Sequence, residues 1–378
     1  MSDPTPASVL TPDLLARIRS RAAGYDRENS FFAEDLDELR AAGYLRPRSL
    51  LETARDQRLL AAYAPATALG INMHLVWTGV ARVLHDRGDS SLDWVLADAA
   101  AGELFAFGNS EAGNDLVLFD SLTKAEPLAD GAWAFTGTKI FTSLAPAWTR
   151  LGVFGRDDSD PQHPRLVHGF LTRDTHGWRT IDDWDTLGMR ATQSSSTLLN
   201  GAVVPAERIA RILPAGPVAD PFVFAIFSNF LLLIASVYAG IGDRALELGV
   251  EATKRRTSLK NAGASYAQDP DIRWQVADAA IDLDALKPQI ETLAADVDGL
   301  VDHGADWFRL LTGTKLRAVE TARRVVDRAV KVSGGRSYNS SSELARLYRD
   351  VLAGLFHPSD AESVHSTVAT NLLGPLDG

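Results

Sequence analysis

The chain has 378 residues, of which 46% are hydrophobic and 23% are charged. This balance is that of a globular protein rather than a disordered chain, and the length allows two or three domains. The net charge of −11 argues against non-specific binding of nucleic acid, which requires a basic surface. Because the chain contains no cysteine, disulfides, thiolate metal ligands and a cysteine nucleophile are excluded.

No segment indicates export or a membrane. The amino-terminal stretch MSDPTPASVLTPDLLARIR has no basic segment followed by an apolar one, so no signal peptide is expected. The longest apolar run, Phe222–Ala235, is interrupted by Ser228 and Asn229 and is too short to span a bilayer. We therefore expect this run to form a buried helix in a cytoplasmic protein that does not bind membranes.

The first hundred residues alternate helical segments with short breaks. Leu36 and Leu39 recur at helical spacing, and Gly43 stands where a helix would end. A second apolar, alanine-rich helix is expected over Tyr63–Leu84. These patterns predict an N-terminal helical domain over residues 1–104.

From Leu104 onward the pattern changes to short β-prone runs separated by turn residues. The expected strands are Leu104–Phe107, Ala132–Phe135, Lys139–Thr142, Leu151–Phe154, Val167–Leu171 and Ser196–Leu199. Because no long helix intervenes, residues 105–215 are predicted to form an antiparallel barrel or sandwich rather than a parallel sheet.

After Pro221 the pattern is helical again. The expected helices are Phe222–Val250, Asp271–Asp298, Trp307–Ser333 and Asp360–Leu373. Helices of this length bury their apolar faces against one another, so residues 216–378 are predicted to form a bundle. The fold class is therefore mostly α with a middle β-domain.

Common metal and nucleotide motifs are absent from the sequence. The eight histidines form no His-x-x-x-His pair with an acidic partner, so no metal site is expected. There is also no G-x-G-x-x-G after a strand, no P-loop and no G-x-S-x-G elbow. A Rossmann fold is therefore not expected.

Four segments together suit a planar redox ring with a phosphate tail. They are Phe105–Asp115, Gly137–Ser143, Leu187–Ser195 with the following Val204-Pro205, and Lys331–Tyr338 with Arg346–Asp350. An isoalloxazine ring requires an aromatic wall, which Phe107 and Phe141 can supply, and hydrogen-bonding groups, which Ser110 and Ser143 can supply.

The fourth segment contains a Gly-Gly pair. Gly334 and Gly335 carry no Cβ, so their backbone N–H groups could closely approach a pyrophosphate. The alternative is an ordinary helix end, which glycine also favours.

In this order, the four segments resemble the acyl-CoA dehydrogenase superfamily of flavoproteins over about residues 35–374. The L-G-M-R-A-T-Q-S-S segment is the most specific part. The resemblance implies a helical domain, a β-domain and a four-helix bundle, with a flavin between the last two. It also implies a homo-oligomer, either a dimer or a tetramer, because the Gly-Gly loop contacts the flavin tail of a neighbouring subunit.

The resemblance also assigns roles to single residues. Ser110 and Phe141 match flavin contacts, Ser143 matches the hydroxyl near the reactive nitrogen of the ring, and Gly334 with Gly335 matches the pyrophosphate loop.

Arg255 begins the segment that matches an R-x-x-F-G motif contacting the adenine half of FAD. Ser258 and Leu259 replace its Phe-Gly, and Lys331 replaces the glutamine that usually opens the Gly-Gly loop. FAD is the expected flavin, and these departures leave FMN open.

Two further residues are assigned to the substrate pocket. His74 and Trp77 lie on the helix that the resemblance places over that pocket, and ordinary core packing is the alternative for both.

The usual catalytic base of the superfamily is missing. Acyl-CoA dehydrogenases remove an α-proton with a glutamate, whose pKa burial can raise. Its usual position holds Pro358, and the rarer position near Leu232 has no acid. Asp360 and Glu362 are the nearest acids, but neither has the family spacing.

The Phe-His-Pro sequence at residues 356–358 resembles a different branch, the two-component flavin monooxygenases typified by dibenzothiophene monooxygenase. There a histidine at the position of His357, together with an asparagine and a serine that match Asn109 and Ser143, surrounds the reactive edge of the flavin. A separate reductase supplies the reduced flavin, which reacts with O₂ in a water-poor pocket. An imidazole can donate or accept a hydrogen bond there, or His357 could simply pack at the end of its loop.

Three functions remain open. The first is an O₂-using monooxygenase of a small-molecule substrate, supplied by a flavin reductase. The second is an acyl-CoA dehydrogenase with a displaced base, and the third is a catalytically silent homologue that acts as a binding subunit.

Overall fold

The computed structural model describes residues 8–260 and 262–376. The first seven residues, part of the stretch considered above for a signal peptide, lie outside the described residues. The described chain begins with helices α1 (Pro12–Glu28), α2 (Ala33–Ala41), α3 (Leu50–Ala61), α4 (Pro65–Asp86) and α5 (Asp93–Ala100). Gly43 follows α2 with a φ of 79°, as expected for a glycine at a helix end.

The middle of the chain forms an eight-stranded sheet with the order β6-β7-β3-β2-β4-β5-β8, and β1 pairs with β4. The strands are β1 (Phe105–Gly108), β2 (Lys124–Pro127), β3 (Trp133–Lys139), β4 (Arg150–Asp157), β5 (Arg165–Thr172), β6 (Trp178–Thr180), β7 (Thr197–Val204) and β8 (Ile209–Pro214).

The sheet differs from the expectation in two ways. It is mixed rather than antiparallel, because β1 and β2 both pair with β4 in parallel. The strand expected over Lys139–Thr142 is wrong: β3 ends at Lys139, since Phe141 has a φ of 55°, which no strand accommodates.

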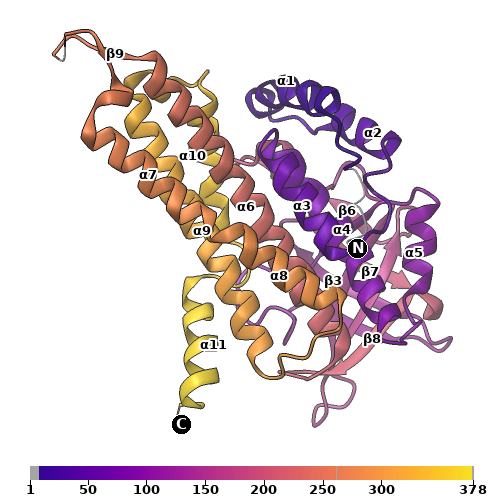
Figure 1. The fold of residues 1–378 in the computed structure, drawn as a ribbon. Helices are drawn as coiled ribbons and strands as arrows, with labels where there is room; N and C mark the ends of the chain where they lie inside the picture. The colour runs from indigo at the N-terminus through magenta and orange to yellow at the C-terminus, as the bar shows by residue number, and fades with distance from the viewer. Residues whose placement is uncertain (1–7, 261, 377–378) are drawn as a thin grey trace, which may run out of the picture.

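The C-terminal part is helical (Figure 1). Its helices are α6 (Pro221–Arg255), α7 (Pro270–Asp284), α8 (Leu286–Asp298), α9 (Asp306–Ser333), α10 (Glu343–Val351) and α11 (Ala361–Leu373), with a short β9–β10 hairpin (Thr257–Ser258 and Ala264–Ser265) after α6. The single helix expected over Asp271–Asp298 is two helices. Pro288 cannot donate a hydrogen bond to the carbonyl of Asp284, so the ladder breaks there.

Local sequence explains where the long helices begin. Asp220 and Asp269 cap the N-termini of α6 and α7 by accepting backbone hydrogen bonds, and each is followed by a proline that needs no helical donor. Such a cap contributes about 1 kcal/mol to helix stability.

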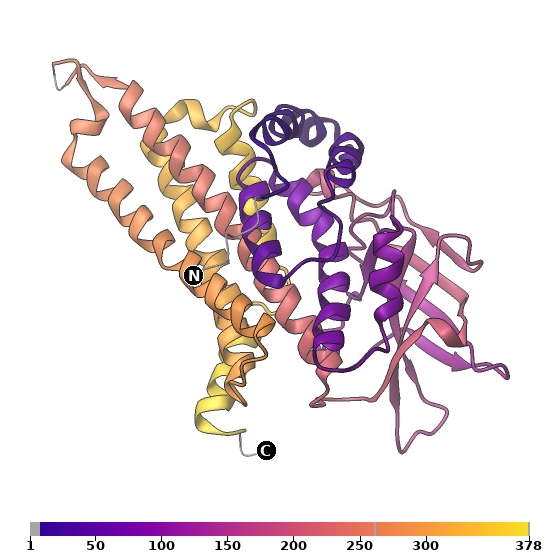
Figure 2. The ribbon, with the colours of Figure 1, turned by 45° about the vertical axis from the view of Figure 1, so that its right-hand side comes forward.

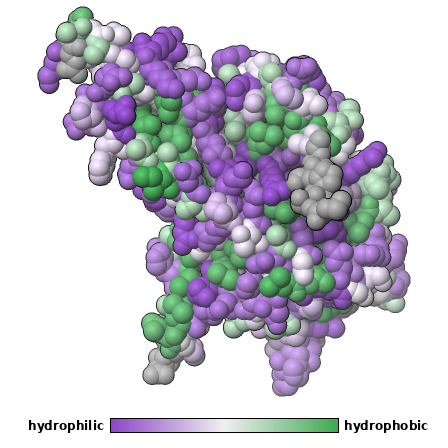
Figure 3. All heavy atoms as spheres, viewed as in Figure 1, coloured by the Kyte–Doolittle hydropathy of each residue, from purple (hydrophilic) through white to green (hydrophobic). Residues whose placement is uncertain are grey.

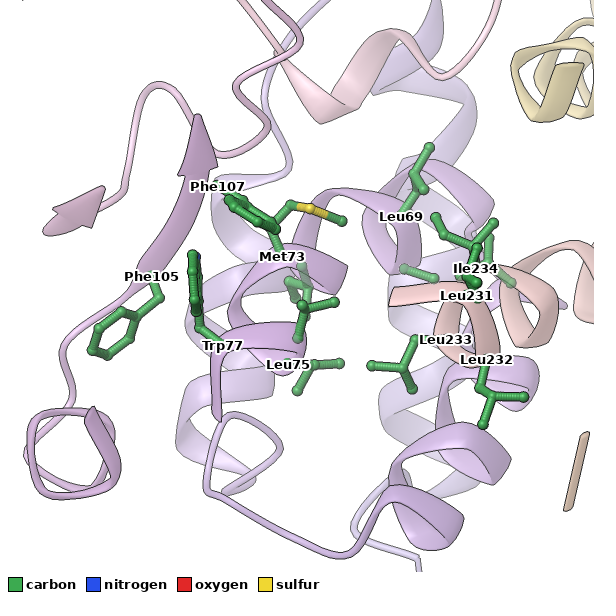
Figure 4. Close-up of a cluster of buried hydrophobic side chains, with 14 of the residues drawn as sticks. Leu69, Met73, Leu75, Trp77, Phe105, Phe107, Leu231, Leu232, Leu233 and Ile234 are labelled. Atoms are coloured by element: carbon green, nitrogen blue, oxygen red, sulfur yellow. The ribbon is translucent and has the colours of Figure 1, made fainter. Parts of the chain in front are cut away.

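One cluster of buried side chains runs through the N-terminal helices, the sheet and the bundle. Figure 2 shows the N-terminal helices between the bundle and the sheet, where α4 packs against both α6 and β1. In Figure 4, Met73 and Phe107 lie side by side, and Leu69 and Leu231 meet between α4 and α6. The changes from helix to strand and back to helix fall near the expected domain boundaries. Because the three parts share one core, their division into three domains stays a prediction.

Helix α6 is long and apolar enough to cross a membrane by length and composition, and it is the one such helix among the described residues. However, 83% of its most apolar stretch is buried inside the protein. Its apolar surface is therefore covered by neighbouring helices, as in the core of a globular protein, and the run from Phe222 to Ala235 is a buried helix as expected.

Candidate active site

A cavity of about 450 Å³ lies where α4, the sheet, α6 and the end of α10 meet. Its walls are mainly aliphatic and aromatic, with Met73, Phe107, Phe141, Phe230 and Leu231 among them. A cavity of this size, apolar with a few polar groups, is typical of a small-molecule or cofactor site. All three residues predicted as catalytic, Asn109, Ser143 and His357, line it, as do the predicted flavin contacts Phe107, Ser110 and Phe141.

The loops that follow β1 and β3 form one wall. The N–H of Ile140 donates to the carbonyl oxygen of Ser110 at 2.8 Å, which joins the two segments. Phe141 adopts a left-handed conformation and meets Trp184 edge to face, with 6.1 Å between ring centroids. Both rings line the cavity, so this turn presents aromatic surface to a ligand.

A chain of hydroxyl groups fixes the polarity of Ser143. The hydroxyl of Thr192 donates to the carbonyl of Met189 at 2.9 Å, so it must accept from Ser194 at 2.8 Å. Ser194 must then accept from Ser143 at 2.7 Å. With its proton used in this way, the Ser143 oxygen can offer only lone pairs to the cavity.

Asn109 offers a second acceptor. Its Oδ1 atom is buried and has no hydrogen-bond partner among residues 8–260 and 262–376. An unsatisfied buried oxygen of this kind costs about 1–3 kcal/mol, and a rotation of the Asn109 side chain toward the cavity that it lines would let a ligand N–H recover it. Two acceptors beside aromatic walls fit the edge of a flavin ring, so the residues present suit that cofactor.

A buried ion pair anchors the loop that carries Asn109. The ammonium group of Lys139 lies 2.7 Å from the Glu111 carboxylate, and both side chains are buried. Glu111 also accepts hydrogen bonds from Ser121, Leu122 and Thr123. The carboxylate therefore ties the segment after β1 to the segment that leads into β2.

The two most specific sequence segments meet at the cavity. The N–H of Met189 donates to Asp350 at 2.6 Å, and a guanidinium N–H of Arg349 donates to the carbonyl of Leu187 at 2.9 Å. A Cβ at Gly188 would lie 2.4 Å from the backbone of Arg349, so only glycine fits there. Burial raises the pKa of the Asp350 carboxyl to about 6, and its hydrogen bond from the Met189 N–H opposes that shift.

The other bonds of Arg349, and those of Arg190 nearby, are structural. Arg349 pairs with Asp26 at the end of α1. Arg190, whose guanidinium also donates to the carbonyl of Asp26, forms an ion pair with Asp185. These bonds join α1, the loop that precedes β7, and α10.

No carboxylate lines the cavity in the described part of the chain. Pro358 stands at the usual base position, and Leu232 is buried away from the cavity beside Leu231, which lines it. Asp360 caps α11 by accepting from the backbone N–H of Ser363, which lowers the pKa of the Asp360 carboxyl. Neither Asp360 nor Glu362 reaches the cavity, and no cluster of possible metal ligands occurs in residues 8–260 and 262–376.

His74 and Trp77 do not line the cavity, contrary to the expectation. His74 Nε2 contacts the carbonyl of Leu45 at 2.8 Å, and its Nδ1 accepts from the Phe105 N–H at 3.2 Å. Burial lowers the pKa of this imidazole to about 4. Trp77 donates to the carbonyl of Ala106 at 3.0 Å. Both side chains point from α4 toward β1, so the core-packing alternative describes them.

The residues assigned to the cofactor tail also lie away from the cavity. Arg255 is exposed at the end of α6, and Gly334 ends α9 with a φ of 72°. A Cβ on Gly334 would lie 2.6 Å from the guanidinium of Arg256, which donates to the carbonyl of Val332. Gly334 thus serves as a helix end in this chain, while Gly335 has open space around it.

The chain is similar to several known proteins. Residues 232–359 match the family model described as the C-terminal domain of acyl-CoA dehydrogenase. An L-evernosamine nitrososynthase from Micromonospora is 28% identical over 93% of this chain and 87% of its own. A dibenzothiophene monooxygenase from Mycolicibacterium goodii is 30% identical over 66% of this chain and 64% of its own. The solved structure of KijD3 with FMN and a dTDP-linked amino sugar has 26% identity and a TM-score of 0.82, and covers 96% of this chain and 91% of that one.

Together with these relatives, the fold identifies the chain as a flavin-dependent oxidoreductase. The match over residues 232–359 and the shared fold confirm the resemblance to the acyl-CoA dehydrogenase superfamily that the four motif segments indicated.

The sequence reasoning missed several residues of the site. Trp184, Arg349 and the α6 side chains Phe227 and Phe230 line the cavity, and Tyr238 contacts His357. Most of these are apolar residues on helices whose pattern gives no sign of a cavity. Lys315, which fixes the turn that carries His357, was missed as well, although a charged residue on the buried stripe of α9 between Leu311 and Val319 is a signal that the pattern offered.

Proposed function

We propose that this protein is a monooxygenase that takes up reduced FMN from a separate reductase and oxygenates a small, uncharged and largely apolar substrate. The observation that carries the proposal is the composition of the cavity. It contains Asn109, Ser143 and His357 but no carboxylate, so it lacks the glutamate with which acyl-CoA dehydrogenases remove the α-proton of a thioester.

The polarity of the cavity supports uptake of the reduced cofactor. A reduced isoalloxazine ring carries more N–H donors than the oxidised ring does. The Ser143 oxygen and Asn109 Oδ1 are both available as acceptors, so they favour the reduced form. The bound flavin would supply two electrons to O₂, with one oxygen atom entering the substrate and the other leaving as water.

The residues of the chain would position the reactants and exclude water. Phe107 and Phe141 would hold a planar ring, and the apolar side chains of α4 and α6 would keep water from the reaction. Arg349, the one charged residue that lines the cavity of the described chain, is already paired with Asp26. The cavity therefore suits an uncharged substrate better than a coenzyme A thioester or a nucleotide sugar.

FMN is proposed in place of the FAD expected from the sequence. Ser258 and Leu259 replace the Phe-Gly that contacts the adenine half of FAD, and Leu259 is 98% exposed. The KijD3 relative was solved with FMN. A neighbouring copy would be needed to place Gly335 near the phosphate, so a homo-oligomer remains part of the proposal.

A spectroscopic titration tests this function. We expect purified protein to bind reduced FMN under anaerobic conditions and, with a flavin reductase and O₂, to oxygenate an uncharged aromatic probe such as indole. A saturated acyl-CoA should not bleach bound oxidised flavin. Rapid bleaching by the thioester would instead establish a dehydrogenase, and failure to bind flavin in either redox state would establish a silent binding subunit.

Gly335 provides a test of the shared site. Because a Cβ at Gly335 meets no atom of the described residues within 4 Å, Gly335→Leu should leave the melting temperature within about 2 °C of the parent value, as for other surface changes. If a neighbour's FMN phosphate lies against this loop, its binding should weaken at least tenfold by fluorescence titration. Unchanged FMN affinity, or light scattering that shows only monomers, would contradict the shared site.

The Ser340→Leu variant is a useful control for that experiment, since it adds an apolar side chain at an exposed position near the same turn without removing a positive charge or changing either glycine. We expect it to alter FMN affinity less than Gly335→Leu does.

Apolar surface on α11 is consistent with assembly. In Figure 3 green atoms gather on the projecting α11 segment, where Leu372 and Leu373 are 66% and 86% exposed. In a single copy α11 packs against α9.

A further inference from the structure

His357 is held from behind by a tyrosine. The hydroxyl group of Tyr238, on α6, lies 2.9 Å from His357 Nε2, and Tyr238 is fully buried. Within residues 8–260 and 262–376, the phenol makes no other hydrogen bond. The other ring nitrogen, Nδ1, has no hydrogen bond to the described residues, while the His357 ring lines the cavity.

The chemistry of this pair selects one tautomer. Burial, together with the positive charge of Lys315, lowers the pKa of the His357 imidazole to about 3, so the ring is neutral near pH 7. Burial also keeps the Tyr238 phenol protonated, because it raises the pKa of that group well above its usual value. A phenol is the better donor and a neutral imidazole nitrogen the better acceptor, so Nε2 accepts and Nδ1 carries the proton.

A buried lysine fixes the turn that carries His357. The ammonium group of Lys315, on α9, donates to the carbonyl oxygens of Gly354, His357 and Ser359, at 3.3, 2.8 and 2.8 Å. The Lys315 side chain is buried, and no carboxylate lies within ion-pair distance of it in the described chain. All three ammonium protons are therefore used in hydrogen bonds to one turn, and these bonds fix the position of its backbone.

We propose that Tyr238 and Lys315 are positioning residues that hold His357 as its Nδ1–H tautomer and so present a neutral hydrogen-bond donor to the cavity. The donor complements the two acceptors that line the same cavity, Ser143 and Asn109. The role of this donor in oxygenation rests on the proposed function, whereas the tautomer does not.

The tautomer can be measured without cofactor or substrate. In protein labelled with ¹⁵N-histidine, the two ring nitrogens of a neutral imidazole have well-separated chemical shifts that depend on which one is protonated. We expect His357, assigned by the signals lost in His357→Gln, to be the Nδ1–H form. In Tyr238→Phe we expect a mixture of tautomers, and in the control Tyr348→Phe no change. An Nε2–H form in the parent, or an unchanged tautomer in Tyr238→Phe, would overturn the proposal for Tyr238.

The role of Lys315 is tested by measuring two quantities separately: the affinity for reduced FMN, and the coupling of O₂ consumption to substrate oxygenation. Lys315→Met should leave the affinity for reduced FMN within about twofold but raise the hydrogen peroxide released per O₂ consumed severalfold, because the turn no longer fixes His357. Lys287→Met, at an exposed lysine of α8, should change neither quantity. Equal losses of FMN affinity and coupling in Lys315→Met would assign Lys315 a merely structural role.

If Lys315→Met does not fold, Lys315→Gln retains two donors and gives the same comparison. A parent protein that oxygenates no substrate, but still shows the Nδ1–H form and its loss in Tyr238→Phe, would contradict the proposed function and leave the tautomer assignment intact.

Discussion

Replacing Glu111 with glutamine should lower the free energy of unfolding by about 3–5 kcal/mol, because it removes one partner of a buried ion pair. The Lys139 ammonium would remain buried without a carboxylate, and an amide cannot accept all the hydrogen bonds that Glu111 receives from residues 121–123. Urea denaturation monitored by tryptophan fluorescence measures this change. A matched control is Glu126→Gln, at an exposed position of β2, which should change stability by less than about 0.5 kcal/mol.

The same pair predicts a loss of stability in acid. Burial on its own raises the pKa of the Glu111 carboxyl, but the Lys139 ammonium and the hydrogen bonds to the carboxylate lower it to about 2. Because this pKa is depressed in the folded protein, the ionised Glu111 carboxylate contributes fully to stability when the pH lies above the usual pKa of a glutamate. This contribution is lost as the pH falls from about 4.5 toward 2. Glu111→Gln should therefore flatten the acid side of the stability profile, and an unchanged profile would contradict the pairing.

Replacing His357 with alanine should uncouple O₂ consumption from substrate oxygenation. The loss of one hydrogen bond to the cofactor region corresponds to about 1–3 kcal/mol. With tenfold for every 1.4 kcal/mol, hydrogen peroxide release should rise roughly 5- to 150-fold. Peroxide assays run with oxygen-electrode measurements give this ratio directly.

Two variants isolate the effect of the His357 ring. His163→Ala removes an exposed imidazole near β5 and should leave coupling unchanged. His357→Ala also strands the buried hydroxyl of Tyr238, and the double variant with Tyr238→Phe removes that penalty. Full coupling in the double variant would show that His357 only packs at the end of its loop.

Much of the fold could be predicted from hydrophobic periodicity. The long helices α4, α6 and α9 and the strands β4 and β5 fall where the pattern placed them, because burial on one face requires that pattern. Boundaries set by single residues were missed. The left-handed Phe141 ends β3 early, and Pro288 divides one expected helix into α7 and α8.

The site was only partly accessible from sequence. The resemblance to the two-component flavin monooxygenases grouped Asn109, Ser143 and His357, and all three line one cavity. Local pattern cannot distinguish a ligand-facing histidine from a packed one, so His74 was assigned to the pocket although its two nitrogens bond to backbone in the core. Its position on an apolar helix was compatible with both roles.

Arg349 and Asp26 are separated by 323 positions in the chain, yet they form one ion pair at the edge of the cavity. During synthesis, the helix that carries Asp26 emerges long before its partner does, and domains begin to fold from the amino terminus. Asp26 therefore lacks its partner Arg349 until α10 has been synthesised. A chain that stops before Arg349 would also lack His357, so the cavity cannot form in a truncated product. Such a fragment would expose the apolar side chains that line the cavity in the complete fold, and we expect chaperones and proteases to recognise it.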